Sequence, residues 1–600
     1  MSSPEISAAT APGQEVAATS SPLPQVFGEV VAGRLADILD HQNANGAIDY
    51  GGGVPAVYPQ QAILPLAFCW AGLDPKAPRW RGHPRVATAI TRLGDYLLSW
   101  YDDRGRVSYD SHGYQVCGVD QRLTYAWLEA LRLLYPARAS FALEAWSDKI
   151  SRACQTLLEE KLLRLQGVRR FVARVTGTGT NHVMLYLSTV YRAGVVLERP
   201  DFCHLALPIA RALARDMHPD GYWDEHSDLQ RSGGPTPSYN YITLTGMGLM
   251  AAWTGETIFA EAVARAARFH ADFCYPDGTF LDLIDERARY DPSPRPADAF
   301  YDCPRVWGLF AFSGTPEGRG LAALHMAGWL AKTPPDRPVN PETLARHVEN
   351  FTYWKPGPFA APPTDQRRHR ASLTLPAGLF RAGPWCLGLS AIRAGNAEDP
   401  AYRHNPFALE RQKLFSVWHE KTGLIIDGSH SKHQPENSTF AAAPDAAHDY
   451  FPCGGEVGQA DGEFWVRAVY KTFVGTVRLR PLDHRTLWIQ MSVDPAATRG
   501  PFSAAFTLRV LDRKIIGLAG PIYELGTQGF SISSHVLGGG FVLGPITVTG
   551  ARGFQLNWPL APFNSYTSDH KSRFEMWVPR VSVDFRGPLN VAEFTIRLGA

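Results

Sequence analysis

The stretch HPDGYW at residues 218–223 returns as YPDGTF at residues 275–280, and this repeat decides the fold. In both copies a glycine, Gly221 or Gly278, precedes aromatic and apolar residues. Weaker versions of the turn occur at Gly46, Gly105 and Gly167, so it recurs roughly every 60 residues, about the length of one helical hairpin with its loops. Glycine here supplies the positive φ that commonly ends a helix. The sequence therefore predicts repeated helical hairpins.

The segments between these turns have the periodicity of buried helices. In residues 83–103 the apolar residues Val86, Ile90, Leu93, Leu97 and Trp100 recur at the helical period of 3.6. Similar stripes occur at residues 121–134, 182–197, 241–253 and 260–273. Stacked hairpins form an open solenoid or close into a toroid, and the sequence leaves this choice open. In both arrangements the loops that follow equivalent turns lie along the same edge of the helical domain, which we call the rim.

The pattern changes after about residue 371 to alternating apolar and polar residues, in runs rich in β-branched and aromatic side chains. These runs lie at residues 414–419, 463–470, 476–482, 486–493, 506–511, 546–550, 573–585 and 592–598. Proline-rich residues 352–376 form the expected linker. We predict a disordered tail at 1–23, a helical domain at 24–370 and an antiparallel, β-sandwich-like domain at 371–600.

Composition excludes several classes of protein. The chain has 59 Lys and Arg against 58 Asp and Glu, a net charge of +1, which gives no overall attraction to nucleic acid or anionic membranes. The eight cysteines form no CxxC pair, which argues against a disulfide framework or a cysteine zinc site. The first residues lack the basic start and apolar core of a signal peptide, and no later run approaches the roughly 18 apolar residues of a membrane span. We expect a cytoplasmic protein.

The segments that follow the glycine turns are rich in aromatic and polar side chains. Aromatic rings stack on the apolar faces of sugars, while Arg, Asn and His meet carboxylates and hydroxyls, so one rim of such residues suits a carbohydrate. Each of them can alternatively be an ordinary core residue. The candidates for substrate binding are Tyr58, Tyr109, His112, Tyr114, Arg174, Trp223 and Arg231, and Asn181, His182, Tyr239 and Tyr241 lie in the same segments.

The β-rich half adds a polar loop with two histidines. Residues 418–440 read WHEKTGLIIDGSHSKHQPENSTF, in which a predicted strand runs into His430 and His433. These side chains either face the cleft or are exposed in a simple hairpin turn. The His-x-x-His spacing outside a helix is weak evidence for a metal site, so no metal ligand is assigned.

The order of these features resembles the heparinase II/III-like polysaccharide lyases. The resemblance rests on the helical repeats with TNH at 180–182, the tyrosine-containing loop opened by a DG turn, and GSHSKHQPE at 428–436. It implies an incomplete (α/α) toroid followed by antiparallel β-sheets, with β-elimination of a uronic-acid-containing oligosaccharide or polysaccharide to an unsaturated product. We expect no cofactor. The resemblance makes a structural divalent metal in the β domain an open alternative, although the ligand spacing here does not support one.

The resemblance also implies roles for individual residues. Asn181 and His182 match the pair that engages the uronate carboxylate, and Tyr239 matches the tyrosine that exchanges protons with the sugar, with Tyr241 as a rival. His430 corresponds to the histidine of the β domain, with His433 as the alternative for that role and a candidate for substrate binding. Neutralising the carboxylate is the central task, because its charge opposes the second charge that develops when the C5 proton leaves.

Two other functions remain open at this point. Toroidal glycoside hydrolases need two carboxyl groups that flank the scissile bond. The available acidic residues are Asp224, Glu225, Asp228, Asp282, Asp285 and Glu286. The third function is carbohydrate binding without catalysis. The sequence leaves open the uronic acid, the linkage, the leaving sugar, endo or exo action, syn or anti elimination, and the oligomeric state.

Overall fold

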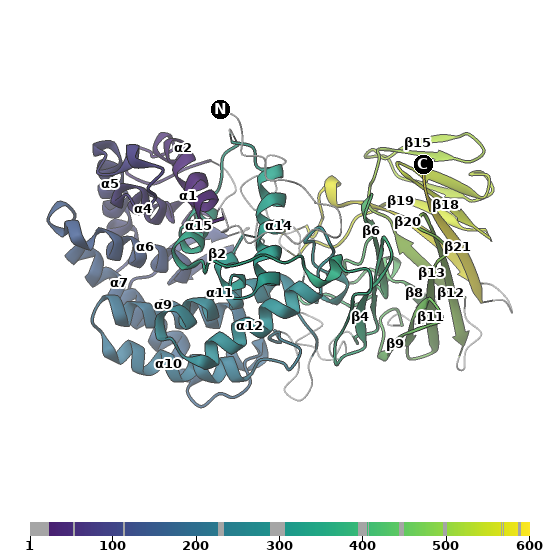
Figure 1. Cartoon of the computed structure of the whole chain (residues 1–600), viewed down its shortest axis with the longest axis horizontal. Helices are drawn as coiled ribbons and strands as arrows, with labels where there is room; N and C mark the ends of the chain where they lie inside the picture. The colour runs from purple at the N-terminus through teal and green to yellow at the C-terminus, as the bar shows by residue number, and fades with distance from the viewer. Residues whose placement is uncertain are drawn as a thin grey trace. The chain divides into compact units, whose positions relative to one another are not determined.

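The structure is a computed structural model, in which the chain divides into two compact units (Figure 1). Unit 1 comprises residues 1–223, 239–269 and 291–361, and unit 2 comprises residues 224–238, 270–290 and 362–600. The residues that the structure describes are 23–51, 55–111, 114–225, 233–287, 306–335, 337–393, 405, 407–442, 449–495, 501–551, 553–565, 567, 569–585 and 590–599. Two segments that precede the linker thus belong with the C-terminal half.

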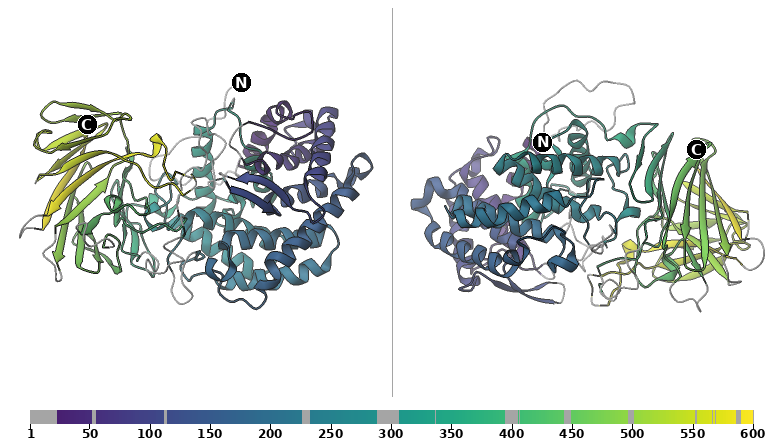
Figure 2. Two further views of the ribbon diagram at one scale, coloured as in Figure 1. Left: turned by 180° about the vertical axis from the view of Figure 1, so that it is seen from behind. Right: turned by 90° about the horizontal axis from the view of Figure 1, so that it is seen from below.

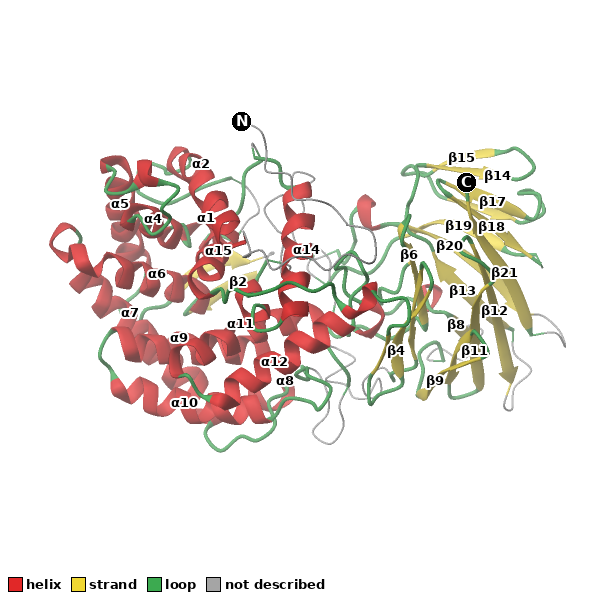
Figure 3. Cartoon of the chain, viewed as in Figure 1, coloured by secondary structure: helices red, strands yellow, loops and turns green. Residues whose placement is uncertain are grey.

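Unit 1 is built almost entirely of helices (Figure 3). They are α1 (Leu23–Gly33), α2 (Leu35–Asp40), α3 (Val57–Gln60), α4 (Ile63–Ala71), α5 (Pro84–Trp100), α6 (Gln121–Leu134), α7 (Leu143–Leu157), α8 (Ala173–Thr176), α9 (Thr180–Val196), α10 (Pro200–Arg215), α11 (Pro237–Thr254), α12 (Thr257–Asp272), α13 (Leu309–Phe312), α14 (Pro316–Lys332) and α15 (Pro341–Tyr353). Units 1 and 2 are seen from two further directions in Figure 2. The predicted helical character of the N-terminal half is confirmed.

The glycine turns have the predicted backbone conformation. Gly46, Gly105, Gly167, Gly221 and Gly278 all have positive φ, between 74° and 96°. Two of them also need the absence of a side chain. A Cβ on Gly46 would lie 2.2 Å from the backbone oxygen of Arg92, and one on Gly221 would lie 2.5 Å from that of Arg265. These turns therefore pack directly on the backbones of helices α5 and α12.

Within the described residues, two stretches of the N-terminal half differ from the loops that the sequence predicts. Residues 108–115 are mostly strand, because β1 (Val107–Ser111) and β2 (Tyr114–Gly118) form an antiparallel hairpin. The aromatic stretch 218–241 is not loop throughout, since α11 begins at Pro237 and contains both Tyr239 and Tyr241. Proline suits the first turn of a helix, where its missing N–H is not needed.

The described residues of unit 2 form three antiparallel sheets. Their strands are β3 (Arg370–Ser372), β4 (Ala377–Ala382), β5 (Trp385–Ser390), β6 (Phe415–His419), β7 (Gly423–Ile426), β8 (Phe440–Ala442), β9 (Gly454–Ala460), β10 (Glu463–Val469), β11 (Phe473–Pro481), β12 (Thr486–Pro495), β13 (Phe502–Thr507), β14 (Lys514–Gly517), β15 (Ile522–Glu524), β16 (Phe530–Ser533), β17 (Gly540–Leu543), β18 (Ile546–Gly550), β19 (Gln555–Leu560), β20 (Val578–Phe585) and β21 (Val591–Leu598). The sheet orders are β15-β14-β17-β18-β21-β12-β11-β10-β9, β16-β19-β20-β13-β8 and β3-β4-β5-β6-β7.

The three sheets share one hydrophobic core. Leu387 of β5, Phe506 of β13 and Ile596 of β21 belong to the same buried cluster. The alternation that predicted the strands has the expected effect in β10 and β11, where buried side chains alternate with more exposed ones, whereas β5 and β6 are buried on both faces. Two predicted runs are too long. Strand β13 ends at Thr507, and residues 574–576 form a 3-10 turn before β20 begins.

The part of the chain that the structure describes contains no helix long and apolar enough to cross a membrane.

Candidate active site

The first turn of helix α6 carries several polar side chains of the candidate site. Asp120 is the N-cap residue, with an extended backbone, and its Oδ1 accepts hydrogen bonds from the backbone N–H groups of Arg122 and Leu123, at 3.1 and 2.9 Å. Such a cap satisfies N–H groups that the helix itself leaves without acceptors. It also fixes the direction in which the side chains of Gln121 and Arg122 leave the helix.

Three consecutive residues at this turn contact three of the predicted site residues. The hydroxyl of Tyr109 donates to Oδ2 of Asp120 over 3.1 Å. Nε2 of Gln121 lies 3.2 Å from Nδ1 of His182, and Nη2 of Arg122 donates to the hydroxyl of Tyr58 over 3.2 Å. We call these residues the α6 cluster: Tyr58, Tyr109, Asp120, Gln121, Arg122 and His182. The structure thus brings together residues that the sequence predicts from three separate turns.

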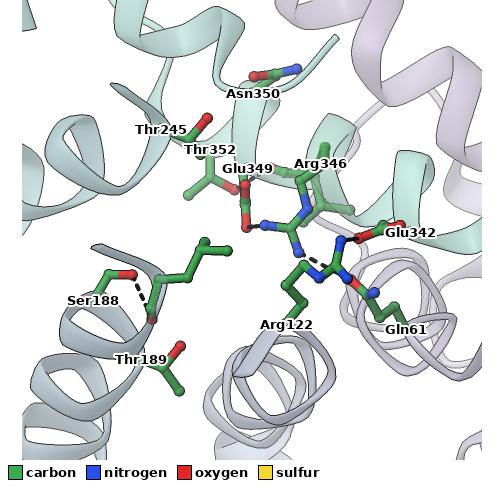
Figure 4. A network of polar contacts seen from close by, with 12 residues as sticks. Gln61, Arg122, Ser188, Thr189, Thr245, Glu342, Arg346, Glu349, Asn350 and Thr352 are labelled. Atoms are coloured by element: carbon green, nitrogen blue, oxygen red, sulfur yellow. Dashed lines mark hydrogen bonds and ion pairs between the residues drawn. The ribbon is translucent and has the colours of Figure 1, made fainter. Parts of the chain in front are cut away.

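Arg122 also connects the α6 cluster to a polar network inside the helical unit. Its Nη1 donates to Oε1 of Glu342 over 3.0 Å, and Figure 4 shows this pair beside Arg346, whose Nη1 donates to Oε1 of Glu349 over 2.6 Å. The guanidinium carbons of Arg122 and Arg346 lie 5.8 and 5.3 Å from the centre of the Trp307 ring. Burial raises the pKa of Tyr58 to about 12, although Arg122 lowers it.

Asn181 and His182 occupy the first turn of helix α9. Asn181 is 3% exposed, and its Oδ1 has no hydrogen-bond partner among the described residues. His182 is half-buried and its ring lies 6.3 Å from that of Tyr186. The N-terminus of a helix carries a partial positive charge that attracts anions. This turn therefore combines amide and imidazole groups with an electrostatic preference for a negatively charged ligand.

Helices α9 and α11 run side by side in the same direction. A Cβ on Gly246, in the middle of α11, would lie 2.6 Å from the side chain of Met184, in the second turn of α9. Near their ends, the rings of Trp253 and Tyr191 stack with their centres 6.3 Å apart. The first turns of the two helices therefore lie at the same end of unit 1, and both contain residues predicted for the chemistry.

The two tyrosines in α11 have different surroundings. Tyr239 is half-buried, whereas Tyr241 is 1% exposed and its hydroxyl lies 2.7 Å from Nε2 of His325. Trp223 is likewise buried, with its indole N–H donating to the carbonyl of Leu213 over 3.1 Å. The hydroxyl of Tyr241 and the indole N–H of Trp223 are committed to internal hydrogen bonds, which argues against direct contact with a substrate, so the half-buried Tyr239 is the better candidate.

The remaining predicted residues of this half are placed as follows. Arg174 is exposed on α8. Tyr114 begins strand β2. His112 and Arg231 lie outside the described residues.

The two histidines of unit 2 differ from each other. His430 is 2% exposed, its Nε2 donates to the carbonyl of Leu283 over 2.8 Å, and its Nδ1 accepts from the backbone N–H groups of Gln412 and Lys413. Burial lowers the pKa of His430 to about 3, so the ring is neutral near pH 7. His433 is exposed, with positive φ, and its Nδ1 lies 3.5 Å from Oε1 of Glu410.

The acidic residues considered for hydrolysis are engaged inside unit 2. Glu225 accepts from Nη1 of Arg287 at 2.7 Å, and Asp285 accepts from the backbone N–H groups of Ser238 and Arg287. Others in this set are also buried or bonded: Asp224 is 3% exposed, Glu286 lies 3.6 Å from Arg411, and Asp282 accepts from the hydroxyl of Ser429. Asp228 lies outside the described residues. These carboxylates act as internal partners, and a pair flanking an open site is not formed by them.

A metal ion does not fit the described side chains. Within the ranges that the structure describes, no three His, Cys, Asp or Glu side chains come together as ligands of one ion. In the β unit, the buried carboxylate of Asp427 is instead neutralised by the ammonium group of Lys413, at 2.9 Å. We therefore derive no step through a metal.

No family model and no curated protein matches this chain. Among solved structures, it resembles heparinase III with a TM-score of 0.51 and 11% sequence identity, covering 98% of this chain and 87% of that chain. This chain has the heparinase III fold. A heparan sulfate lyase from Pedobacter heparinus has a TM-score of 0.42 at 10% identity, covering 96% of this chain and 84% of that chain. An unsaturated glucuronyl hydrolase specific for heparin has a TM-score of 0.36 at 12% identity and covers 55% of this chain and 96% of that chain.

Within this heparinase III fold, sequence reasoning missed four polar residues. Asp120, Gln121 and Arg122 directly precede or begin a predicted helix, and an Asp before an apolar stripe is the signature of an N-cap. That signal could have found the helix start but not its contacts. Glu342 carries no such signal, because it reaches Arg122 from a helix 220 residues further along the chain.

Proposed function

We propose that this protein is a polysaccharide lyase that cleaves a uronic-acid-containing glycan by β-elimination. The fold of heparinase III supports a lyase scaffold. The observation that carries the proposal is the first turn of α9, where the buried Asn181 amide and the half-buried His182 ring lie together at a helix N-terminus. Hydrogen-bond donors at a site of positive potential suit a carboxylate whose charge must be stabilised.

The reaction requires three events at the uronate. A base takes the proton from C5, the C4–O4 bond breaks as the C4=C5 double bond forms, and an acid protonates the leaving O4. Because the C5 proton is weakly acidic, the carboxylate must accept the charge that develops, and in our proposal Asn181 and His182 donate hydrogen bonds to it. Preorganised donors of this kind supply a large part of catalysis, on the order of 10²- to 10³-fold for each donor.

Tyr239 is the proposed proton-transfer group. Helices α9 and α11 start at the same end of unit 1, which puts Tyr239 on the same rim as His182. A phenol has an ordinary pKa of about 10, so it can protonate O4 as the neutral acid and can act as a base once it has lost its proton. If one tyrosine does both, base and acid act on the same face of the sugar.

Tyr241 provides a matched comparison for Tyr239. Both residues lie in α11, but Tyr241 is buried against His325. The experiment is ultraviolet absorbance of the full-length protein with a panel of uronate-containing oligosaccharides, because the conjugated C4=C5 product absorbs and a hydrolysis product does not. We expect a rise for the wild type that His182→Ala and Tyr239→Phe abolish, whereas Tyr241→Phe keeps the signal.

The other outcomes assign the other functions. New reducing ends without absorbance would replace elimination by hydrolysis. Binding of the glycan without either product would make the protein a carbohydrate-binding protein. Among the described residues the hydrolase has no specific support, because Glu225 and Asp285 are internal partners there.

A further inference from the structure

The glycine turn at Gly167 packs differently from three other turns of the repeat in unit 1. A Cβ added to Gly46, Gly105 or Gly221 would lie within 2.5 Å of the backbone of a later helix, which is α5, α7 or α12. A Cβ on Gly167 would meet no atom within 4 Å. Three turns therefore press against a helix, whereas the turn at Gly167 has open space beside it.

This open space belongs to a groove of about 620 Å³ between the Gly167 turn and helix α10. In the other three turns the contacted residue follows the glycine by 44 to 48 positions: Arg92 follows Gly46, Ala153 follows Gly105 and Arg265 follows Gly221. The same offset from Gly167 falls at residues 211–215 of α10, and Ala212 and Arg215 line the groove. The groove thus occupies the place where the repeat otherwise packs. Its volume is in the range of small-molecule sites, about 300 to 1,000 Å³.

The groove combines an aliphatic floor with basic side chains. Leu165 and Ile209 in its lining are each 3% exposed. Arg169, His204 and Arg215 also line it and are exposed, and none of them forms an ion pair in the part of the chain that the structure describes. Two unpaired guanidinium groups beside one groove attract an anion.

The acidic residue in the lining does not cancel this charge. Asp216 already accepts from Nη1 of Arg170 at 3.3 Å and from the backbone N–H of Phe171 at 2.6 Å. Its carboxylate is therefore neutralised from the side of the Gly167 turn. The two arginines of the groove keep their charge for a ligand.

Helix α10 also offers a backbone acceptor at the groove. Pro208 lies inside the helix and lines the groove together with His204. Because proline has no N–H, the carbonyl of His204, four residues earlier, lacks its usual helical donor. A hydroxyl group of a ligand can supply that donor. Guanidinium groups, a carbonyl acceptor and aliphatic surface together suit a sugar that carries a carboxylate, because its C–H face is apolar and its other groups are polar.

The groove lies at the end of unit 1 where helix α9 begins. The N–H of Phe171 donates to Asp216 in the lining of the groove, and its carbonyl accepts from the hydroxyl of Thr180 over 2.6 Å. Thr180 directly precedes Asn181 in the first turn of α9. One residue, Phe171, thus connects the groove with the turn that we propose for the carboxylate of the reacting sugar.

We propose that this groove binds a second uronate of the same glycan, outside the position of cleavage, with Arg169 and Arg215 donating hydrogen bonds to its carboxylate. Arginine suits this role because its planar guanidinium donates two parallel hydrogen bonds to one carboxylate. The inference rests on the proposed lyase function and deepens it, since it makes the substrate a chain with more than one uronate.

The kinetic test compares long and short substrates in the full-length protein. In Arg169→Ala/Arg215→Ala we expect KM for a uronate polymer to rise about 10-fold, whereas KM for the shortest cleaved oligosaccharide changes less than about twofold. The difference for the polymer should shrink in about 1 M salt, which screens exposed charges. Arg169→Lys/Arg215→Lys keeps the charge without the fork and should recover part of the loss.

A matched control removes the same charge elsewhere in unit 1. Arg79→Ala/Arg138→Ala changes two other exposed arginines and should keep the wild-type KM for both substrates. Thermal unfolding of both double variants should give the melting temperature of wild type, because Arg169 and Arg215 form no ion pair among the described residues. An equal rise of KM in both double variants would reduce the effect to net charge and overturn the proposal.

Direct binding distinguishes the two proposals from each other. Isothermal titration calorimetry of wild type with polygalacturonate, alginate and hyaluronan, and with polyglutamate as a carboxylate polymer without sugars, needs no turnover. We expect one of the glycans to bind about 10-fold more weakly to Arg169→Ala/Arg215→Ala and polyglutamate to bind poorly to wild type. Unchanged glycan affinity in this variant, or polyglutamate binding as tight as that of the glycan, would overturn the groove as a uronate site. Groove-dependent binding of a glycan that is never converted to an unsaturated product would keep the groove and overturn the lyase function instead.

Discussion

The α6 cluster of unit 1 and the loop of unit 2 that contains His430 and His433 both place polar groups around an imidazole. The two rings differ in burial and in their hydrogen-bond partners. His182 is half-buried, and its Nδ1 meets a side-chain amide. His430 is buried, and backbone groups occupy both of its nitrogens. A buried ring whose two nitrogens are bonded to backbone groups has a structural role. A half-buried ring at the start of a helix is a candidate for contact with a ligand. Burial and bonding therefore separate a structural histidine from a candidate functional one.

The largest effect is expected where a donor is presented to the substrate. Asn181→Ala removes an amide beside His182, and we expect the rate of elimination to fall on the order of 10²- to 10³-fold with little change in melting temperature. The measurement is kcat/KM by ultraviolet absorbance, together with thermal unfolding. A variant with a wild-type rate would show that Asn181, in the first turn of α9, does not donate to the carboxylate.

His430→Ala is the matching change in unit 2, and its effect should appear in stability. The variant leaves the Leu283 carbonyl and the N–H groups of Gln412 and Lys413 without their partner in a buried place. We expect a loss of about 2–4 kcal/mol in the free energy of unfolding, measured by urea denaturation, since each buried polar group left unpaired costs about 1–3 kcal/mol. A variant with the stability of wild type but without activity would instead show that His430 takes part in the reaction. The contrast between a functional His182 and a structural His430 would then be wrong.

The buried carboxyl group of Glu349 is expected to affect the stability of the protein and its pH dependence. It is 2% exposed beside Arg346, and its Oε2 has no hydrogen-bond partner among the described residues. Burial raises the pKa of Glu349 from 4.5 to about 7, against the lowering effect of Arg346. Between these pH values the folded chain keeps a proton that the unfolded chain has lost, so this contribution to stability is complete below about pH 4.5 and is lost as the pH rises to about 7.

The expected size is about 1–3 kcal/mol, because each unit of pKa shift corresponds to about 1.4 kcal/mol. Urea denaturation at pH 5 and pH 7.5 measures it, with Glu349→Gln as the variant that should lose this part of the pH dependence. Equal slopes of stability against pH in wild type and variant would mean that Glu349 is ionised in the folded protein.

Local patterns in the sequence predicted much of the fold and part of the candidate site. The apolar periodicity at residues 121–134 coincides with helix α6. The positive φ of Gly221 was predicted from the six-residue motif HPDGYW. The α6 cluster was beyond such patterns, because its contacts join residues 61 and 64 positions apart. Tyr239 and Tyr241 could not be separated in a predicted loop, whereas in a helix residues two apart point in different directions.

The burial of Tyr241 makes Tyr241→Phe a smaller perturbation than the removal of His430. The variant leaves Nε2 of His325 without the hydroxyl at 2.7 Å but keeps the ring and its packing. We expect a loss of about 1–2 kcal/mol in the free energy of unfolding. Thermal unfolding measures it. A lost rate at unchanged stability would make Tyr241 the proton-transfer residue and displace Tyr239.

The smallest effect on stability is expected at His433, the exposed member of the histidine pair. Its exposed ring lies 3.5 Å from Oε1 of the buried Glu410, which also accepts a hydrogen bond from the backbone N–H of His433. Alanine keeps the backbone hydrogen bond, and a contact with one exposed partner contributes under about 1 kcal/mol. Urea denaturation should therefore barely distinguish His433→Ala from wild type, while His430→Ala is clearly destabilised. Because the removal of the His433 side chain should barely change the free energy of unfolding, a loss of rate in this variant would report on the part that the side chain takes in the reaction. A loss of rate in His433→Ala with none in His430→Ala would sharpen the contrast between buried and accessible histidines. The functional histidine of unit 2 would then be the exposed one.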